Sequence, residues 1–461
     1  MSVITAPPIT NRPPSPPSRR RRPLILAAVM TVVAVSAGVV VTRSTGDPDS
    51  PSRVATSRAN PAAVTTLAQT LTELEAAAAR RPDDPRNWQQ LAQGYVQRSI
   101  QSLDPAYYPL AQKALAKATQ LAPDDPATVV ASASLAVTQH QFATARDLAT
   151  RTISLNPDGP QAYSILVDAE IELGRYDEAA AALQDLLDRR PGAAPLARVA
   201  YLRELHGDLP GATEAMRDAE SASAGDTAFE RATYTTLRAD LLLTQGQLDA
   251  AAPLFRRALQ LVPELPLAVI GTARIEAARG ELDPAIDRLA TLVKHAPVPA
   301  AATLLGDLQQ LDGQSAEASD SFALVRALIE LQQAGGVDAD LDLTLFEADY
   351  GTPTDDSIAQ ARRAFTDRPS VYGADALAWT LYRAGRAAEA RPLLDQSLRL
   401  GTVDSQLRYH AAAILDATGD PTGARSQLQQ AVNLNPWFSF SLQAEARQLA
   451  GKLGVSWPVA S

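Results

Sequence analysis

Apolar residues recur along most of the chain with the period of an α-helix, in paired segments separated by a short break. The clearest pair lies between Pro160 and Pro191, where each segment carries apolar side chains along one helical side. Gly174 interrupts the pattern between the two segments. Pro191 ends the second segment, because the residue before a proline is pushed out of the helical region. The sequence therefore predicts a helical hairpin here. The apolar positions are Tyr163, Leu166, Val167 and Ile171 in the first segment, and Ala179, Ala182, Leu183, Leu186 and Leu187 in the second.

The same hairpin pattern returns at intervals of 33 to 41 residues. Hairpins are expected to start near residues 85, 126, 160, 193, 232, 266, 299, 338, 371 and 405. Residues 62–82 have the pattern of half a hairpin, and residues 438–453 that of a closing helix, which repeat arrays need over their last core face. The expected turn glycines are Gly174, Gly207, Gly246, Gly280, Gly313, Gly385 and Gly419, with Gly351 one position out of register.

This pattern resembles the tetratricopeptide repeat, whose 34-residue signature is Trp-x2-Leu-Gly-x2-Tyr, then Ala-x3-Phe, then Pro. The resemblance implies an all-α fold: a right-handed superhelical solenoid of about ten helical hairpins that binds protein or peptide segments. The matching residues are Trp88, Leu91, Ala92, Tyr95, Ala111, Leu115, Ala118 and Pro123, and in a later hairpin Ala251, Phe255, Ala258, Leu261 and Pro263.

The composition favours many closely packed helix pairs over one large core. The chain has 461 residues, of which 46% are apolar and only 5% aromatic, and alanine is common at the expected helix contacts. It contains no cysteine. Disulfides, thiolate zinc sites, a cysteine nucleophile and an N-terminal lipoprotein cysteine are therefore excluded.

The N-terminal region predicts a membrane anchor. Residues 1–22 form a basic, Pro- and Ser-rich segment that is expected to be a disordered cytoplasmic tail. Residues 23–42 contain eighteen consecutive uncharged residues, from Leu24 to Val41, which suits a transmembrane helix that precedes the solenoid and has its N-terminus in the cytoplasm. The alternative is a cleaved signal peptide, with cleavage near Val35-Ser36-Ala37 and a secreted product.

The rest of the chain is then expected to lie outside the cytoplasmic membrane. A flexible linker spans residues 43–61, the solenoid with its closing helix spans residues 62–454, and a short tail spans residues 455–461. After residue 43 the chain carries 36 basic and 52 acidic side chains, a formal net charge of −16. A nucleic-acid groove needs the opposite sign, so no nucleic-acid partner is expected.

The sequence nominates no catalytic, cofactor-binding or metal site. The four histidines fall in four different hairpins, and the chain shows no zinc-protease, nucleophile-elbow, dinucleotide or P-loop spacing. The expectation is therefore a protein that is not an enzyme and that needs neither cofactor nor metal.

Three functions agree with these features. The first is a membrane-tethered scaffold for protein–protein interactions outside the cytoplasmic membrane, as the family resemblance implies. The second is an assembly or maturation factor for an exported enzyme or envelope complex, because residues 71–95 resemble the start of the repeat part of cytochrome c maturation proteins. The third is an accessory subunit of a separate catalytic chain.

One pair of hairpins carries aromatic residues at positions that are concave in the repeat family. In the hairpins starting at 371 and 405, aromatic side chains stand there together with two charged neighbours, and exposed aromatics anchor peptides well. The alternative is that these aromatics only pack against the next hairpin or the closing helix. The candidate protein-binding groove consists of Tyr372, Asp375, Trp379, Tyr382, Arg383 and Tyr409.

The predicted topology can be tested with a protease added outside spheroplasts. We expect it to remove the chain beyond about residue 43 and to spare the arginine tail, because the basic flank of an anchor stays in the cytoplasm. Immunoblots against each end of the protein would show this. Repeats that resist the protease until the membrane is broken would place them on the cytoplasmic side.

Overall fold

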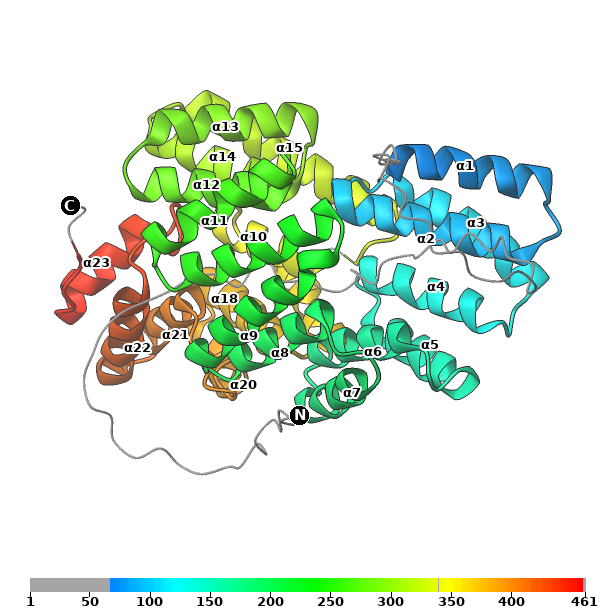
Figure 1. The fold of residues 1–461 in the computed structure, drawn as a ribbon. Helices are drawn as coiled ribbons and strands as arrows, with labels where there is room; N and C mark the ends of the chain where they lie inside the picture. Colours follow the sequence, from blue (N-terminus) through cyan, green and yellow to red (C-terminus); the bar gives the residue numbers. More distant parts are fainter. Residues whose placement is uncertain (1–66, 339, 459–461) are drawn as a thin grey trace.

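The computed structural model describes residues 67–338 and 340–458, and this part of the chain consists of helices and short connections (Figure 1). Its helices are not long and apolar enough for any of them to cross a membrane. The predicted tail, anchor and linker at residues 1–61 lie outside the described residues.

The helices are arranged as successive antiparallel hairpins between an opening and a closing helix. The opening helix is α1 (Leu67–Arg80), and the closing helix is α23 (Gln443–Leu453). The hairpins are α2 (Pro85–Ser102) with α3 (Tyr107–Leu121), α4 (Pro126–Thr138) with α5 (Phe142–Leu155), α6 (Pro160–Glu172) with α7 (Tyr176–Arg189), α8 (Ala193–Leu205) with α9 (Leu209–Ala222), α10 (Ala228–Thr244) with α11 (Leu248–Leu261), α12 (Pro266–Ala278) with α13 (Leu282–His295), α14 (Pro299–Leu311) with α15 (Ser315–Ala334), α16 (Asp340–Tyr350) with α17 (Asp355–Asp367), α18 (Val371–Arg383) with α19 (Ala387–Ala390) and α20 (Leu394–Ser397), and α21 (Ser405–Ala417) with α22 (Pro421–Leu434).

The predicted hairpin starts are confirmed at eight of the ten positions. Two of these helices, α2 and α4, begin with proline after an aspartate cap, as at Pro126, where the Asp125 carboxylate accepts from the Ala127 amide at 2.8 Å. The other two helices start elsewhere: α16 begins at Asp340, two residues after the predicted 338, and the start predicted at 232 was wrong. Helix α10 begins at Ala228, because Thr227 and Glu230 form a capping box that starts the helix one turn earlier.

Two further expectations needed correction. The second helix of the hairpin at 371 is not continuous: a 3-10 turn, Arg391–Leu393, containing Pro392 separates α19 from α20. Gly351 lacks the positive φ of the other turn glycines. In the hairpin at 126 the turn glycine is replaced by His140, which adopts φ 60° and stacks on Phe142 with ring centroids 5.7 Å apart.

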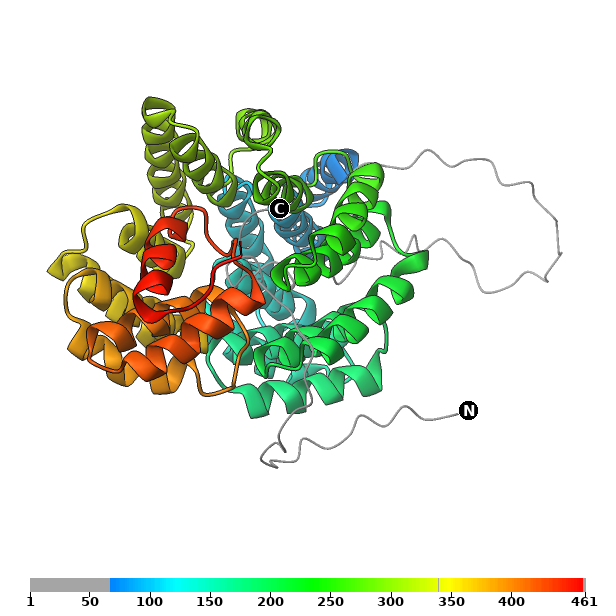
Figure 2. The ribbon, with the colours of Figure 1, turned by 90° about the vertical axis from the view of Figure 1, so that its left-hand side faces the viewer.

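Hairpins far apart in sequence touch, because the array coils back on itself. The early hairpins, α4 to α9, contact the late hairpins, α16 to α22, and the connection between α15 and α16, through residues 195 to 198 positions apart. In Figure 2 the orange late hairpins lie beside the teal early ones. We call this the early–late contact. Its hydrogen bonds include Gln139 Nε2 to Gly335 O at 2.8 Å, the Val371 amide to Tyr176 Oη at 2.9 Å, and Thr402 Oγ1 to Leu205 O at 2.6 Å.

Two turn glycines are required by the early–late contact as well as by backbone conformation. Gly174 and Gly207 both have positive φ, 68° and 75°. A Cβ atom at Gly174 would collide with Pro369 O, and one at Gly207 would lie 2.7 Å from Gly401 O. Any side chain here would push the late hairpins away.

A buried ion pair crosses the early–late contact. Arg368 is 7% exposed, its guanidinium lies 2.5 Å from Glu172 Oε2, and it also covers the ring of Phe142 at 4.9 Å. Replacing Arg368 by alanine leaves the Glu172 charge buried without its partner, so we expect a loss of about 3–5 kcal/mol in stability. Thermal melting and small-angle X-ray scattering should show a lower midpoint and a larger radius of gyration.

The matched control is Arg362→Ala, which removes the exposed Arg362–Glu389 pair within the late hairpins. Exposed pairs contribute about 0–1 kcal/mol, so melting and scattering should barely change. Equal behaviour of the two variants would show that the ion pair does not hold the early and late hairpins together.

Candidate binding surface

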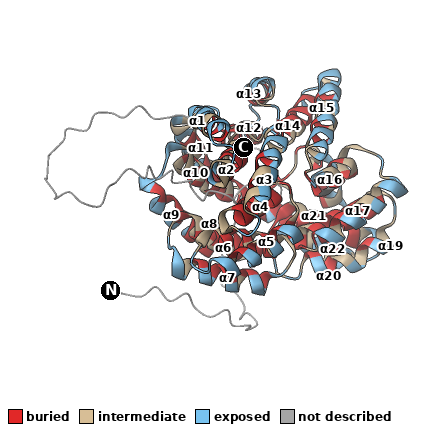
Figure 3. Ribbon diagram, turned by 90° about the vertical axis from the view of Figure 1, so that its right-hand side faces the viewer, coloured by how far each residue is buried: buried red, intermediate tan, exposed pale blue. Residues whose placement is uncertain are grey.

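The first helix of each hairpin forms an inner layer and the second an outer layer. In α18, every residue from Gly373 to Leu381 is buried, as is typical of a helix enclosed on all sides. Helix α5 instead buries one stripe, Phe142, Ala145, Ala149 and Thr152, and leaves its other residues half-buried or exposed. Figure 3 shows the same contrast, with exposed residues concentrated on outer helices such as α7 and α17. We call the side of the first helices that faces the enclosed space the inner surface.

Carboxylates project from the inner surface, and loss of hydration raises their pKa values because protein surrounds them. Burial raises the pKa of Glu204 to about 8 and that of Asp307 to about 7. The same cause raises the pKa values of Asp168, Asp240 and Asp404 to about 6 each. The inner surface therefore holds acids that are partly protonated near neutral pH.

Some of these acids are neutralised by basic partners. Asp168 receives two hydrogen bonds from Arg198, at 2.8 Å from Nε and 2.6 Å from the terminal nitrogen, and Arg198 is only 1% exposed. Asp240, Arg274 and Asp307 stand 34 and 33 residues apart on three successive hairpins, so charges of alternating sign follow one another along the inner surface. Such pairs offset part of the cost of burying charge.

Glu204 has no basic partner of this kind. Its pKa is raised by burial and then by the charges of Asp240 and Asp404. Its Oε2 atom makes no hydrogen bond within the described part of the chain. These three carboxylates come from α8, α10 and the N-cap of α21, and the early–late contact is what brings the last of them close.

Two aromatics of the predicted groove, Trp379 and Tyr409, are enclosed by protein. Trp379 is fully buried and Tyr409 is 2% exposed. The Trp379 ring stacks on His410 at 3.9 Å, and its Nε1 donates to Asp349 Oδ1 at 2.7 Å. Tyr409 packs against Phe438, which precedes the closing helix. The structure thus agrees with the alternative that these rings pack; their role in binding a partner stays a prediction.

Three of the remaining predicted residues lie around the same core, whereas Tyr372 belongs to another. Asp375 is 5% exposed and lies 2.9 Å from His410 Nδ1, and Tyr372 packs into the core of the early hairpins. Tyr382 and Arg383 are half-buried at the edge, where Arg383 pairs with Glu445 of α23 at 2.8 Å. Five of the six predicted residues therefore lie together, all except Tyr372, and in this structure their neighbours belong to the same chain.

A cavity of about 230 Å³ opens on the inner surface, next to the late hairpins. None of the predicted groove residues lines it. The prediction rested on aromatic residues and did not include charged residues that occupy the repeat position of Trp379. The ninth residue counted from a predicted hairpin start is Asp168, Asp240, Arg274, Asp307 or Trp379 in five of the hairpins. The residues that define the cavity are Ile270, Arg274, Asp307, Asp349, Tyr350 and Phe440.

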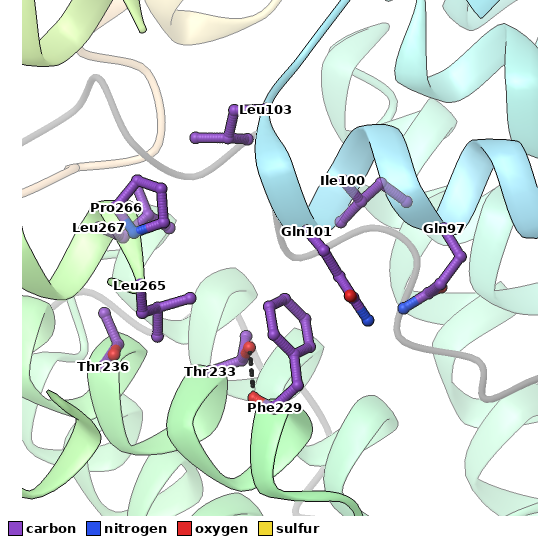
Figure 4. Close-up of a pocket in the computed structure, with 10 residues that line it drawn as sticks. All are labelled: Gln97, Ile100, Gln101, Leu103, Phe229, Thr233, Thr236, Leu265, Pro266 and Leu267. Carbon is purple, nitrogen blue, oxygen red and sulfur yellow. Dashed lines mark hydrogen bonds between the residues drawn. The ribbon is translucent and has the colours of Figure 1, made fainter. Parts of the chain in front are cut away.

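Two further spaces lie where the first hairpin meets α10 to α15. The smaller, of about 30 Å³, is enclosed by α2, α10 and the start of α12, and Thr236 Oγ1 beside it has no hydrogen-bond partner among the described residues (Figure 4). It has room for about one water molecule. The larger, of about 790 Å³, is an open groove with charges of both signs, including Arg98, Glu264 and Arg288.

The described residues offer no evident metal centre. Across residues 67–338 and 340–458, no three or more His, Cys, Asp or Glu side chains are placed to hold a metal ion. The arrangement instead provides buried acids, a few arginines and apolar surface, which are means of recognising a polypeptide.

Three segments of the chain match models of the tetratricopeptide-repeat family: residues 130–194 and 376–436 match one model, and residues 242–308 match another. No curated protein matches the sequence.

Solved structures with a similar arrangement include human IFIT1, a dimer with PPP-AAAA, at 14% identity and a TM-score of 0.43 over 79% of this chain and 86% of that chain. The APC/C hetero-tetramer Cut9-Hcn1 aligns at 13% identity and a TM-score of 0.35, over 82% and 93%. PilW, a type IV pilus biogenesis factor, aligns at 16% identity and a TM-score of 0.37, over 45% and 97%.

The raised pKa values predict how stability depends on pH. Glu204 and Asp307 hold a proton more strongly in the folded than in the unfolded chain, so stability falls as the pH rises toward their folded pKa values of about 8 and 7. Burial lowers the pKa of His140 to about 4, which affects stability only below about pH 6.5. From pH 6.5 to 8.5 we expect the melting midpoint to fall by about 3–5 °C.

The variant Glu204→Gln removes the largest of these contributions, so its melting midpoint should fall by less than half as much over the same range. Gln184, on the outer layer, provides a matched control as Gln184→Glu, which should melt like the parent chain at each pH. If Glu204→Gln shows the full fall, another group is responsible.

Proposed function

We propose that this chain, which contains tetratricopeptide repeats, is a scaffold that binds segments of other proteins on its inner surface. Tetratricopeptide-repeat proteins generally mediate protein–protein interactions. The observation that carries the proposal is the inner cavity, because it combines apolar walls with Arg274 and Asp307, side chains suited to fix the position of a bound segment. Binding there also gives a function to charged residues that add little to a core.

We further propose that the scaffold is tethered to a membrane and acts outside the cytoplasm. The support for this is the sequence of residues 23–42, an uncharged stretch that follows four consecutive arginines. The linker at 43–61 would then let the repeats reach partners at some distance from the bilayer.

We propose further that the chain neither catalyses a reaction nor binds nucleic acid. The first point is supported by the absence of known catalytic spacings from the sequence, and the second by the net charge of −16 after residue 43. Acidic side chains on the inner surface would repel phosphates, whereas they tolerate neutral or basic polypeptide.

Site-specific photocrosslinking in intact cells tests where partners bind. A benzophenone amino acid replaces Thr303, which lines the inner cavity, or Gln184, which is exposed on the outer helix α7. We expect discrete crosslinked proteins from position 303 at five or more times the yield from position 184. Mass spectrometry would identify the crosslinked proteins. They could be components of an enzyme or envelope complex under assembly, subunits of a separate catalytic chain, or other proteins bound by a scaffold.

Equal yields from both positions, or crosslinks from position 184 alone, would place binding on the outer layer. Absence of protein crosslinks at either position would contradict the scaffold function.

A further inference from the structure

The connection between α22 and α23, residues 435–442, is buried to an extent that is unusual for a loop. It has no regular secondary structure, yet each of its residues is buried or half-buried. Connecting segments normally run over the surface, where water satisfies their backbone groups. Something other than chain connection therefore accounts for its position.

The rings of this segment point to two different parts of the molecule. Phe438 is 1% exposed and packs in the core of the last hairpins, 5.1 Å from the Tyr409 ring. Phe440 is 6% exposed and belongs to the core of α12 to α14, with Trp437 packed against the same core. The segment therefore lies between the last hairpin and the inner surface of hairpins more than 130 residues earlier in the chain.

The segment is bound to that inner surface mainly by its rings. Two of its amides bond within the segment: the Trp437 amide donates to Asn435 Oδ1 at 2.6 Å, and the Leu442 amide donates to Ser439 Oγ at 3.2 Å. Tyr350 Oη reaches Ser441 Oγ at 3.3 Å, but makes a shorter bond of 2.7 Å to Asp307. Moving the segment away from Tyr350 would therefore break only the longer of the two hydrogen bonds of that hydroxyl.

Space remains on both sides of the segment. The inner cavity of about 230 Å³ and another cavity of about 620 Å³ both include Asp307, Tyr350, Phe440 and Ser441 in their walls. Withdrawal of Phe440 and Ser441 would remove part of the wall between the two cavities and leave a continuous groove. The segment thus occupies a binding surface without filling it.

We propose that residues 435–442 are an internal ligand, which occupies the groove between α12, α14 and α16 and is displaced by a partner segment of the same chemistry. Such a segment is uncharged and carries two aromatic residues three positions apart, like Trp437 and Phe440. This inference rests on the proposed scaffold function and specifies what the inner surface recognises. Displacement would also move α23, which follows directly in the chain.

The test uses a fluorescein-labelled peptide with the sequence of residues 435–443 and measures its binding by fluorescence anisotropy. The intact protein should bind it weakly, because its groove is occupied. The double variant Trp437→Ala/Phe440→Ala should bind it at least about tenfold more tightly, since the apparent dissociation constant falls as the open fraction rises. A peptide with alanine in place of these two aromatics should bind neither protein.

The location of binding is tested by adding Ala300→Arg to the double variant. Ala300 is exposed and lines the inner cavity, so arginine there should block the peptide with little effect on folding. The matched control is Ala181→Arg, an exposed position on α7, which should leave binding unchanged. Circular dichroism would establish that each variant is folded.

If the double variant does not fold, the intact chain with a benzophenone amino acid at Thr303 replaces it, and excess unlabelled peptide should compete with crosslinking of the labelled one. Each of three outcomes would overturn the inference. They are a folded double variant that fails to bind the peptide, no crosslink at saturating peptide, and a block by Ala181→Arg equal to that by Ala300→Arg. If cellular partners crosslink at position 303 but the peptide does not bind, the proposed scaffold function is retained. Only the proposal that residues 435–442 are an internal ligand is then refuted.

Discussion

The early–late contact determines the shape of this molecule. In a repeat array each hairpin normally touches only its neighbours, so stability is a sum of local terms and the ends are free. Here the Arg368–Glu172 pair and the hydrogen bonds from Gln139 and Thr402 join hairpins about 196 residues apart. The array becomes a closed body, and the unfolding of early and late hairpins is coupled.

Closure also explains the unusual acids. In an open solenoid, Glu204 and Asp404 would face water from separate hairpins and titrate like surface carboxyls. The early–late contact places them near each other and removes much of their hydration, which raises their pKa values to about 8 and 6. The inner surface therefore combines acidity with reduced hydration of its carboxylates.

The helical hairpins of this structure could be predicted from the sequence. Helical periodicity, proline at helix starts and glycine at turns identified the hairpins, because these signals act within a few residues. The early–late contact was not readable, since it results from small rotations accumulated over several repeats. The burial of Trp379 was not predictable for a similar reason. Its position in the repeat is concave, but His410, which covers it, lies on the next hairpin, and residues 435–442 follow that hairpin. The charged residues at the same repeat position as Trp379 were predictable, because the repeat register alone aligns them.

The connection at residues 435–442 shows why position in the repeat is insufficient to define a binding surface. A terminal hairpin must cover its last core face, and Phe438 does so. That need is met without Phe440, whose ring instead completes the core of α12 to α14. If covering the end were the whole task, a polar residue at position 440 would serve better, because it would leave the connection solvated as loops usually are. The aromatic side chain at position 440 is explained by the surface it touches, which lies on α12 to α14, about 130 or more residues earlier in the chain.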